Sequence, residues 1–181
     1  MPSPRHALVA YISNSVGQLV EDLRRELHPA TAHMAAHLTI LPPRHLSGPE
    51  ADALRFLEGA CRNAAPFDVD LGEVTTFLPV TPTVFIRVAQ GAQRMRELHD
   101  QFSVKALCCP EEWPYIPHLT IAKMEREQQV PEALAIARER WAEFAEGRRI
   151  HIDELIFVRE NSDGWQDVAA LPLGRGPVPS R

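Results

Sequence analysis

The tetrapeptide His-Leu-Thr-Ile occurs twice in this chain, at residues 37–40 and again at residues 118–121. Each copy lies in an apolar, β-branched segment that is typical of a strand. Successive side chains of a strand point to opposite faces, so the His and Thr of each copy share one face and the Leu and Ile share the other. Two such strands favour a duplicated fold in which both His-Thr faces meet across a cleft.

Strand and helix patterns alternate along the chain in the order β-α-β-α-β-β-α-β-α-β-β. The predicted strands cover residues 7–12, 37–41, 67–71, 83–88, 117–122, 150–158 and 165–173. The predicted helices begin near Asn14, Pro49, Gln93 and Pro131, and Pro29 and Gly147 end the first and the last. This order predicts a mixed α/β (α+β) chain of duplicated β-α-β units, with helices on one face of each sheet and a pseudo-twofold axis. We expect one bilobal domain over residues 1–173 and a flexible Pro/Gly-rich tail over residues 174–181.

The duplicated motif suits acid–base chemistry at a phosphate group. An unperturbed histidine has a pKa near ~6.5, so at neutral pH one imidazole can be neutral while the other is protonated. The neutral ring of His37 or His118 could accept a proton from water, and the protonated ring could donate one to a leaving oxygen. The hydroxyls of Thr39 and Thr120 could donate to phosphate oxygens. This layout requires no metal ion, and we expect no cofactor. The alternative is that duplicated structural strands produced the repeat and that the motifs serve packing.

Composition limits the class of partner. The net charge is −5, and no run of Lys or Arg is longer than two residues, which excludes the basic face typical of long-duplex binders. No apolar stretch approaches the ~20 residues of a membrane helix, so we expect no membrane partner. The three cysteines lack CxxC spacing, which favours a reducing compartment. We expect a cytoplasmic monomer, and any contact with nucleic acid should be small and local, such as a terminus or a short fragment.

The paired His-x-Thr-x motifs resemble those of the 2H phosphoesterase superfamily, in particular its 2′-5′ RNA ligase-like and RNA 2′,3′-cyclic phosphodiesterase branch. The resemblance implies a bilobal α/β fold and metal-independent opening of a 2′,3′-cyclic phosphate to a 2′-phosphate, with reversible 2′-5′ joining in some members. It implies that His37 is the proton donor to the leaving 3′-oxygen and that His118 is the base that activates water. It also implies that Thr39 and Thr120 bind the phosphate.

Two departures from that pattern concern substrate contacts. The branch tends to have Arg five residues after the second motif histidine, where this chain has Lys123. A lysine binds phosphate as a point charge without a bidentate fork, and strict alternation would turn Lys123 away from His118 unless a bulge intervenes. The first motif runs into Pro42, Pro43 and Arg44, where RNA-joining members more often continue with an apolar-Gly segment.

Three residues are candidates for substrate binding. Arg44 could clamp a phosphate, Lys123 could hold one, and Tyr115 could stack on a base. The alternatives are a solvated loop for Arg44 and loop packing with Trp113 for Tyr115. A basic cleft could also form from Arg5, Arg44, Arg87 and Lys123.

We therefore predict a two-histidine phosphodiesterase that acts on 2′,3′-cyclic phosphates at RNA ends or on nucleotides. One alternative is a phosphodiesterase for another nucleotide, such as a 2′-5′ oligonucleotide or an ADP-ribose cyclic phosphate. The other is a module that binds phosphorylated RNA ends without turnover.

Overall fold

The computed structural model describes residues 3–174 and contains four α-helices and one eight-stranded sheet in that range. The strands are β1 (Arg5–Tyr11), β2 (His37–His45), β3 (Phe67–Thr76), β4 (Thr83–Gln90), β5 (His118–Lys123), β6 (Arg149–Ile152), β7 (Glu154–Asn161) and β8 (Gly164–Pro172). The helices are α1 (Ser15–Leu27), α2 (Glu50–Arg62), α3 (Ala92–Phe102) and α4 (Val130–Glu143). The predicted order of helices and strands is thus confirmed, with one strand more than expected.

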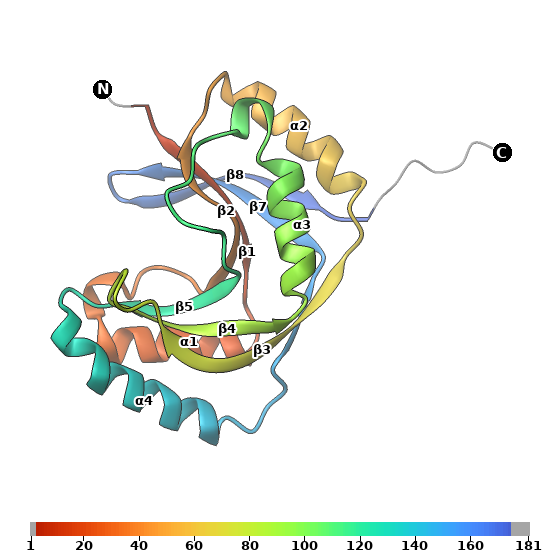
Figure 1. The fold of residues 1–181 in the computed structure, drawn as a ribbon. Coiled ribbons are helices and arrows are strands. Elements are labelled where there is room, and N and C mark those ends of the chain that lie inside the picture. Colours follow the sequence, from red (N-terminus) through yellow and green to blue (C-terminus); the bar gives the residue numbers. More distant parts are fainter. Residues whose placement is uncertain (1–2, 175–181) are drawn as a thin grey trace.

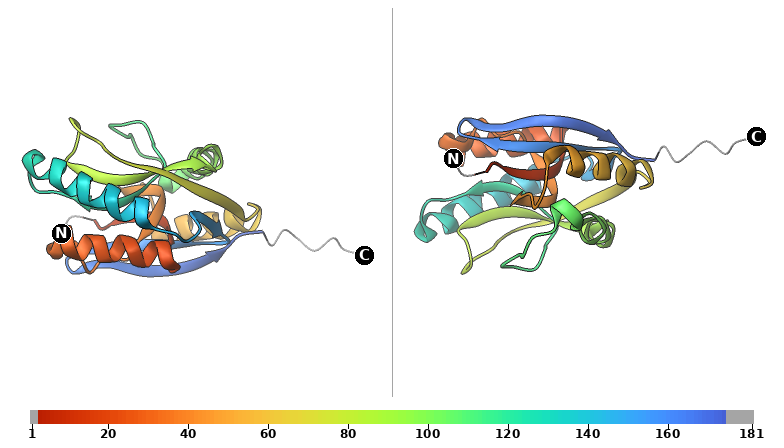
Figure 2. Two further views of the ribbon diagram at one scale, coloured as in Figure 1. Left: turned by 90° about the horizontal axis from the view of Figure 1, so that it is seen from below. Right: turned by 90° about the horizontal axis from the view of Figure 1, so that it is seen from above.

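The sheet consists of two four-stranded halves that meet at the two motif strands. The strand order is β6-β3-β4-β5-β2-β1-β7-β8, and all pairings are antiparallel. Strands β5 and β2 join the halves through a single registered pair, Leu38 with Leu119. The halves curl away from this junction and form two layers, with β3 and β4 in one and β7 and β8 in the other (Figures 1 and 2). The expected bilobal arrangement is confirmed, although the lobes share one continuous sheet.

Two of the four helices pack across the junction of the two halves. Helix α1 follows β1 but contacts β5 of the other half, and α3 follows β4 but contacts β2. Helices α1 and α4 lie side by side at one end of the molecule (Figures 1 and 2). Each half therefore depends on a helix from the other half, so the two lobes share one hydrophobic core.

Helix α1 begins close to the end of β1. The side chain of Asn14 caps the helix by accepting from the backbone amides of Val16 and Gly17, at 3.1 and 3.3 Å. A Cβ atom on Gly17 would lie 1.8 Å from the carbonyl oxygen of Ile12. Glycine at position 17 thus permits the close approach of α1 to the preceding strand end.

The structure corrects two predicted strands. The segment 150–158 is two strands, because β6 pairs with β3 in one half and β7 pairs with β1 in the other, with Asp153 between them. Strand β2 does not end at Leu41 but continues through Pro42 and Pro43 to His45. Its registered pairing with β5 is confined to Leu38, so the prolines, which have no amide donor, lie beyond that pairing.

The remaining features concern the chain ends and membrane association. The predicted tail, residues 174–181, lies outside the described residues except for Gly174. Across residues 3–174, none of the helices combines the length and the apolar character that crossing a membrane requires.

Candidate active site

The two motifs lie side by side at the junction of the halves, in the antiparallel neighbours β2 and β5. Because Leu38 is paired with Leu119, the antiparallel register places His37 opposite Thr120 and Thr39 opposite His118. Each histidine thus lies across from the threonine of the other motif. The predicted alternation holds, since Leu38, Ile40, Leu119 and Ile121 are fully buried and the His and Thr side chains are partly exposed.

The two imidazoles are oriented by equivalent hydrogen bonds. The Nδ1 of His37 lies 2.8 Å from the carbonyl oxygen of Ala35, and the Nδ1 of His118 lies 2.6 Å from that of Ile116. A carbonyl oxygen can only accept, so Nδ1 carries the proton in both rings and Nε2 remains available for a substrate. Both rings are therefore held in the tautomer in which Nε2 can accept or, after protonation, donate a proton.

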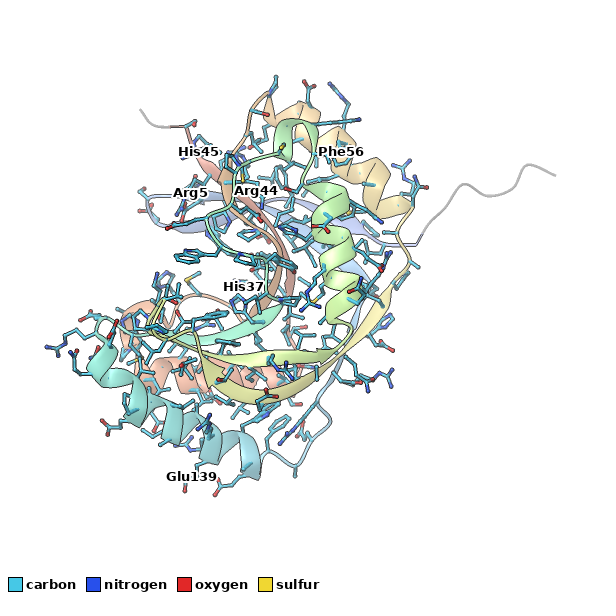
Figure 3. The ribbon with its side chains drawn as sticks, viewed as in Figure 1. Arg5, His37, Arg44, His45, Phe56 and Glu139 are labelled. Atoms are coloured by element: carbon cyan, nitrogen blue, oxygen red, sulfur yellow. The ribbon has the colours of Figure 1, made fainter. Side chains whose placement is uncertain are left out.

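Aromatic side chains surround both histidines. Trp165 of β8 packs against His37 with 4.8 Å between ring centroids. Phe77 and Phe85 contact the ring of His118 edge-on, at 4.8 and 5.3 Å. These contacts restrict the rotation of both rings. Figure 3 shows His37 at the inner surface where the two halves meet.

Burial lowers the pKa of both imidazoles below the ordinary histidine value, and the hydrogen bonds to Ala35 and Ile116 oppose that effect. The positive charge of Arg24 and the proximity of His118 lower the pKa of His37 further. Both rings therefore favour the neutral form in the free protein, and an anionic phosphate between them would favour protonation of one.

A β-bulge follows each histidine–threonine pair. In the ladder of β5 with β4, Thr120 is opposite Phe85 and Ala122 is opposite Val84, so Ile121 is the extra residue. The bulge reverses the alternation and brings Lys123 to the face of His118 and Thr120, where all three line one cavity. The bulge that the Lys123 prediction required is therefore present.

The same irregularity occurs in the first motif. Thr39 is opposite Val9 and Leu41 is opposite Leu8, which makes Ile40 the extra residue of β2. Pro42 then occupies the place in β2 that Lys123 occupies in β5. The two halves of the site thus differ at this position, with a cation on one side and a proline on the other.

Arg44 lines the cavity but is fully engaged by protein groups. Its guanidinium donates to the carbonyl oxygens of Pro42 and Leu107, to the Ser103 hydroxyl and to Glu111, the last at 2.5 Å. The side chain is buried and anchors the segment before β5 (Figure 3). The alternative of a solvated loop arginine is wrong, and phosphate binding by Arg44 stays a prediction.

Tyr115 connects the two motif strands. Its hydroxyl donates to the carbonyl oxygen of Thr39 at 2.7 Å, and its ring stacks on His99 with 4.2 Å between centroids. Burial raises the pKa of this phenol, so the hydroxyl stays protonated. One face of the ring is occupied by His99, and stacking of a base on the remainder stays a prediction.

Sequence reasoning missed Arg24, a buried residue of α1 that joins the second motif to the segment before the first. Its Nε donates to the carbonyl of Ile121 at 2.9 Å, one terminal nitrogen donates to that of Thr120 at 2.7 Å, and the other donates to the carbonyl of Met34. Glu21, one turn earlier, accepts from the backbone amide of Ala36 at 3.1 Å. The sequence pattern indicated this role, because Arg24 lies within the apolar stripe of the helix, beside Leu23 and Leu27.

A cleft of about 690 Å³ opens beside the motifs. Its lining includes Thr39, His118, Thr120 and Lys123, together with Pro42, Pro43 and Phe77 and the segment 109–116. Within residues 3–174, no cluster of three or more His, Cys, Asp or Glu side chains is placed to hold a metal ion.

Comparisons with known proteins identify the family of this chain. The model of the 2′-5′ RNA ligase superfamily matches residues 12–164. A protein of Bacillus cytotoxicus that is named as a phosphoesterase is 23% identical over 170 residues, which cover 93% of this chain and 96% of that protein. A Bacillus pumilus protein of the same name is 23% identical over 172 residues, 94% of this chain and 98% of that one.

Two solved structures share the fold. LigT of E. coli in complex with phosphate superimposes with a TM-score of 0.64 at 15% identity, over 95% of this chain and 99% of LigT. TT0787 of Thermus thermophilus gives a TM-score of 0.62 at 18% identity, over 96% and 100% of the two chains. Residues of both motifs, Thr39 of the first and His118 and Thr120 of the second, line one cleft. The match of the superfamily model over most of the chain shows that this chain belongs to the 2′-5′ RNA ligase superfamily, within the 2H phosphoesterases.

Proposed function

We propose that this protein is a phosphodiesterase that opens 2′,3′-cyclic phosphates, on nucleotides or at RNA ends, to 2′-phosphates. The observation that carries the proposal is the pair of imidazoles whose Nδ1 atoms are tied to backbone carbonyls, with a threonine of the opposite motif across from each ring. The superfamily match and the phosphoesterase names of the Bacillus relatives support it.

The mechanism is an in-line displacement at phosphorus. Nε2 of neutral His118 takes a proton from a water molecule as the water oxygen bonds to phosphorus. The bond from phosphorus to the 3′-oxygen breaks, and Nε2 of protonated His37 donates its proton to that oxygen. The product is a 2′-phosphate, and the two rings exchange protons with solvent before the next turnover. General acid–base catalysis of this kind contributes about 10²–10⁴-fold to the rate.

The remaining groups bind and orient the phosphate. The hydroxyls of Thr39 and Thr120 donate to the non-bridging oxygens, where negative charge increases in the transition state. The ammonium of Lys123 lies on the same face and neutralises charge on the phosphate. The aromatic side chains beside each histidine reduce the polarity of the site, which strengthens these interactions.

The test is to identify the product. The protein is incubated with 2′,3′-cyclic AMP in excess EDTA, and phosphorus NMR distinguishes the 2′-phosphate from the 3′-phosphate. The proposal predicts conversion to the 2′-phosphate alone. Formation of a 3′-phosphate would contradict the assigned leaving group. Binding without any turnover, on this substrate and on an RNA end, would favour the binding-module alternative.

A further inference from the structure

We propose that the cleft takes a small cyclic phosphodiester with one negative charge and a flat aromatic body, such as a single 2′,3′-cyclic nucleotide, in preference to the end of an RNA strand. This inference rests on the proposed function and narrows its substrate class. Three features of the cleft carry it: its apolar mouth, the balance of its charges and its volume.

Exposed apolar side chains gather at the mouth of the cleft. Among residues 3–174, the exposed large hydrophobic residues are Tyr11, Val80, Val104, Trp113 and Ile116. Val80, Trp113 and Ile116 are 51%, 57% and 42% exposed, and all three line this one cavity. Apolar surface concentrated at a single concave site indicates a ligand that covers it.

The apolar groups come from two separate segments. Val80 belongs to the connection between β3 and β4, whereas Trp113 and Ile116 belong to the segment before β5. Both connections extend to the same open side of the molecule (Figure 1). A flat ligand body could therefore contact both, and the indole of Trp113 offers the largest surface for stacking.

The charges that line the cleft cancel. Arg44 and Lys123 are balanced by Glu111 and Glu112, and Arg44 is already bonded to Glu111. Among the described residues, Lys123 has no carboxylate within ion-pair distance, which leaves it free to meet one phosphate. A second phosphate would find no further free cation in this lining, and Glu112 would repel it.

The other arginines considered for a basic cleft do not supply one. Arg5 is paired with Glu160 at 2.5 Å and does not line the cavity. Arg87 is opposite His118 in the ladder, but its guanidinium is paired with Glu73 at 2.8 Å. The predicted cleft of four basic residues is therefore wrong, because three of the four are neutralised by carboxylates.

The volume of the cleft agrees with a small ligand. Sites for small molecules typically have volumes of roughly 300–1,000 Å³. The value of about 690 Å³ falls within that range and leaves room for one nucleoside with its cyclic phosphate.

The first experiment compares 2′,3′-cyclic AMP with a tetranucleotide that ends in adenosine 2′,3′-cyclic phosphate, at several salt concentrations. We expect kcat/KM for the mononucleotide to exceed that for the tetranucleotide. We also expect KM for both compounds to rise weakly and to the same extent with salt, because screening then acts on one contact between a lysine and a phosphate.

The outcomes separate the two proposals. A tetranucleotide that is used as well as the mononucleotide or better, or whose KM depends more steeply on salt, would overturn the inference and leave the phosphodiesterase function in place. Hydrolysis of neither compound would overturn both. A higher kcat/KM for the mononucleotide, with the same weak salt dependence for both compounds, supports the inference, since the added phosphates then contribute nothing to binding.

The second experiment tests the apolar mouth through Trp113→Ala, with Trp113→Phe as the conservative variant and Val104→Ala as a control outside the cleft. Stacking of one base on an aromatic side chain corresponds to about 5- to 140-fold in affinity. We expect Trp113→Ala to raise KM for 2′,3′-cyclic AMP within this range and Trp113→Phe to restore most of the loss. With glycerol 1,2-cyclic phosphate, which has no base, the variant should match the wild type. An equal loss on both substrates, or no loss on either, would contradict a stacking role.

Discussion

Replacing Arg24 with alanine should destabilise the protein strongly, because this guanidinium joins α1 to the second motif and to the segment before the first. The change removes hydrogen bonds to the carbonyl oxygens of Thr120, Ile121 and Met34 from a side chain that is 4% exposed. Hydrogen bonds to charged groups each contribute about 1.5–3 kcal/mol, so three amount to roughly 5–9 kcal/mol. Burial of the charge costs several kcal/mol, which the alanine variant avoids.

The net loss in the free energy of unfolding should be about 3–5 kcal/mol. For a chain of this size, 1 kcal/mol corresponds to about 2–4 °C, so Tm should fall by roughly 6–20 °C. Arg24→Lys keeps the charge but cannot reach three divergent carbonyls, so it should recover less than half of the loss. Arg25→Ala is the matched control, since Arg25 is exposed and paired only with Asp22.

The assay is urea unfolding followed by tryptophan fluorescence, together with kcat on a cyclic nucleotide. The reasoning would be refuted if Arg24→Ala lost less than about 1 kcal/mol, the value expected for a surface pair. Full recovery by Arg24→Lys would show that the charge alone matters and that the divergent hydrogen bonds do not.

Three further predictions concern charge, pH and close packing. Lys123→Ala should raise KM by about tenfold with little change in kcat, because it removes a charged hydrogen bond to the phosphate. Lys123→Arg keeps that bond and should leave KM near the wild-type value. A fall in kcat alone would contradict this role of Lys123. Because burial lowers the pKa of His37 and His118, the free protein loses these protons below pH ~6.5. The mechanism needs one protonated imidazole, so kcat/KM should fall as pH rises from 6 to 8. A flat profile over that range would contradict this prediction. Gly17→Ala should lower Tm, because the added Cβ atom would clash with the carbonyl oxygen of Ile12. Gly59→Ala in α2 places its Cβ atom in open space and should raise the free energy of unfolding by about 0.5–1 kcal/mol. Thermal unfolding of the two variants measures this contrast.

The motif faces could be predicted because they depend on local periodicity. The spacing of two within each His-Leu-Thr-Ile copy determines which side chains share a face, and the structure has this arrangement in both β2 and β5. The bulge at Ile40 was not predicted, and the bulge at Ile121 was raised only as a condition for Lys123 to face the site. Each copy is nevertheless followed by a second buried apolar residue, Leu41 or Ala122. Two consecutive buried residues interrupt a period of two, and this was the available signal.

The missed features depend on contacts between distant parts of the chain. The split at Asp153 follows from the pairing of β6 and β7 with strands of different halves, which no local pattern encodes. The contact of Trp165 with His37 likewise depends on strand pairing, since β8 reaches β2 only through β7 and β1. Arg24 was the exception, because an arginine within the apolar stripe of a helix must find polar partners in the interior, and this signal is local.

The most direct test of the central claim measures kcat on 2′,3′-cyclic AMP for His37→Ala, His118→Ala and the double variant, with the exposed His151→Ala as the control. Two histidines that act in one step should each cost about 10²–10⁴-fold, and the double variant should lose little more than the worse single variant. The account would be contradicted if either single variant kept more than a tenth of the wild-type rate while remaining folded.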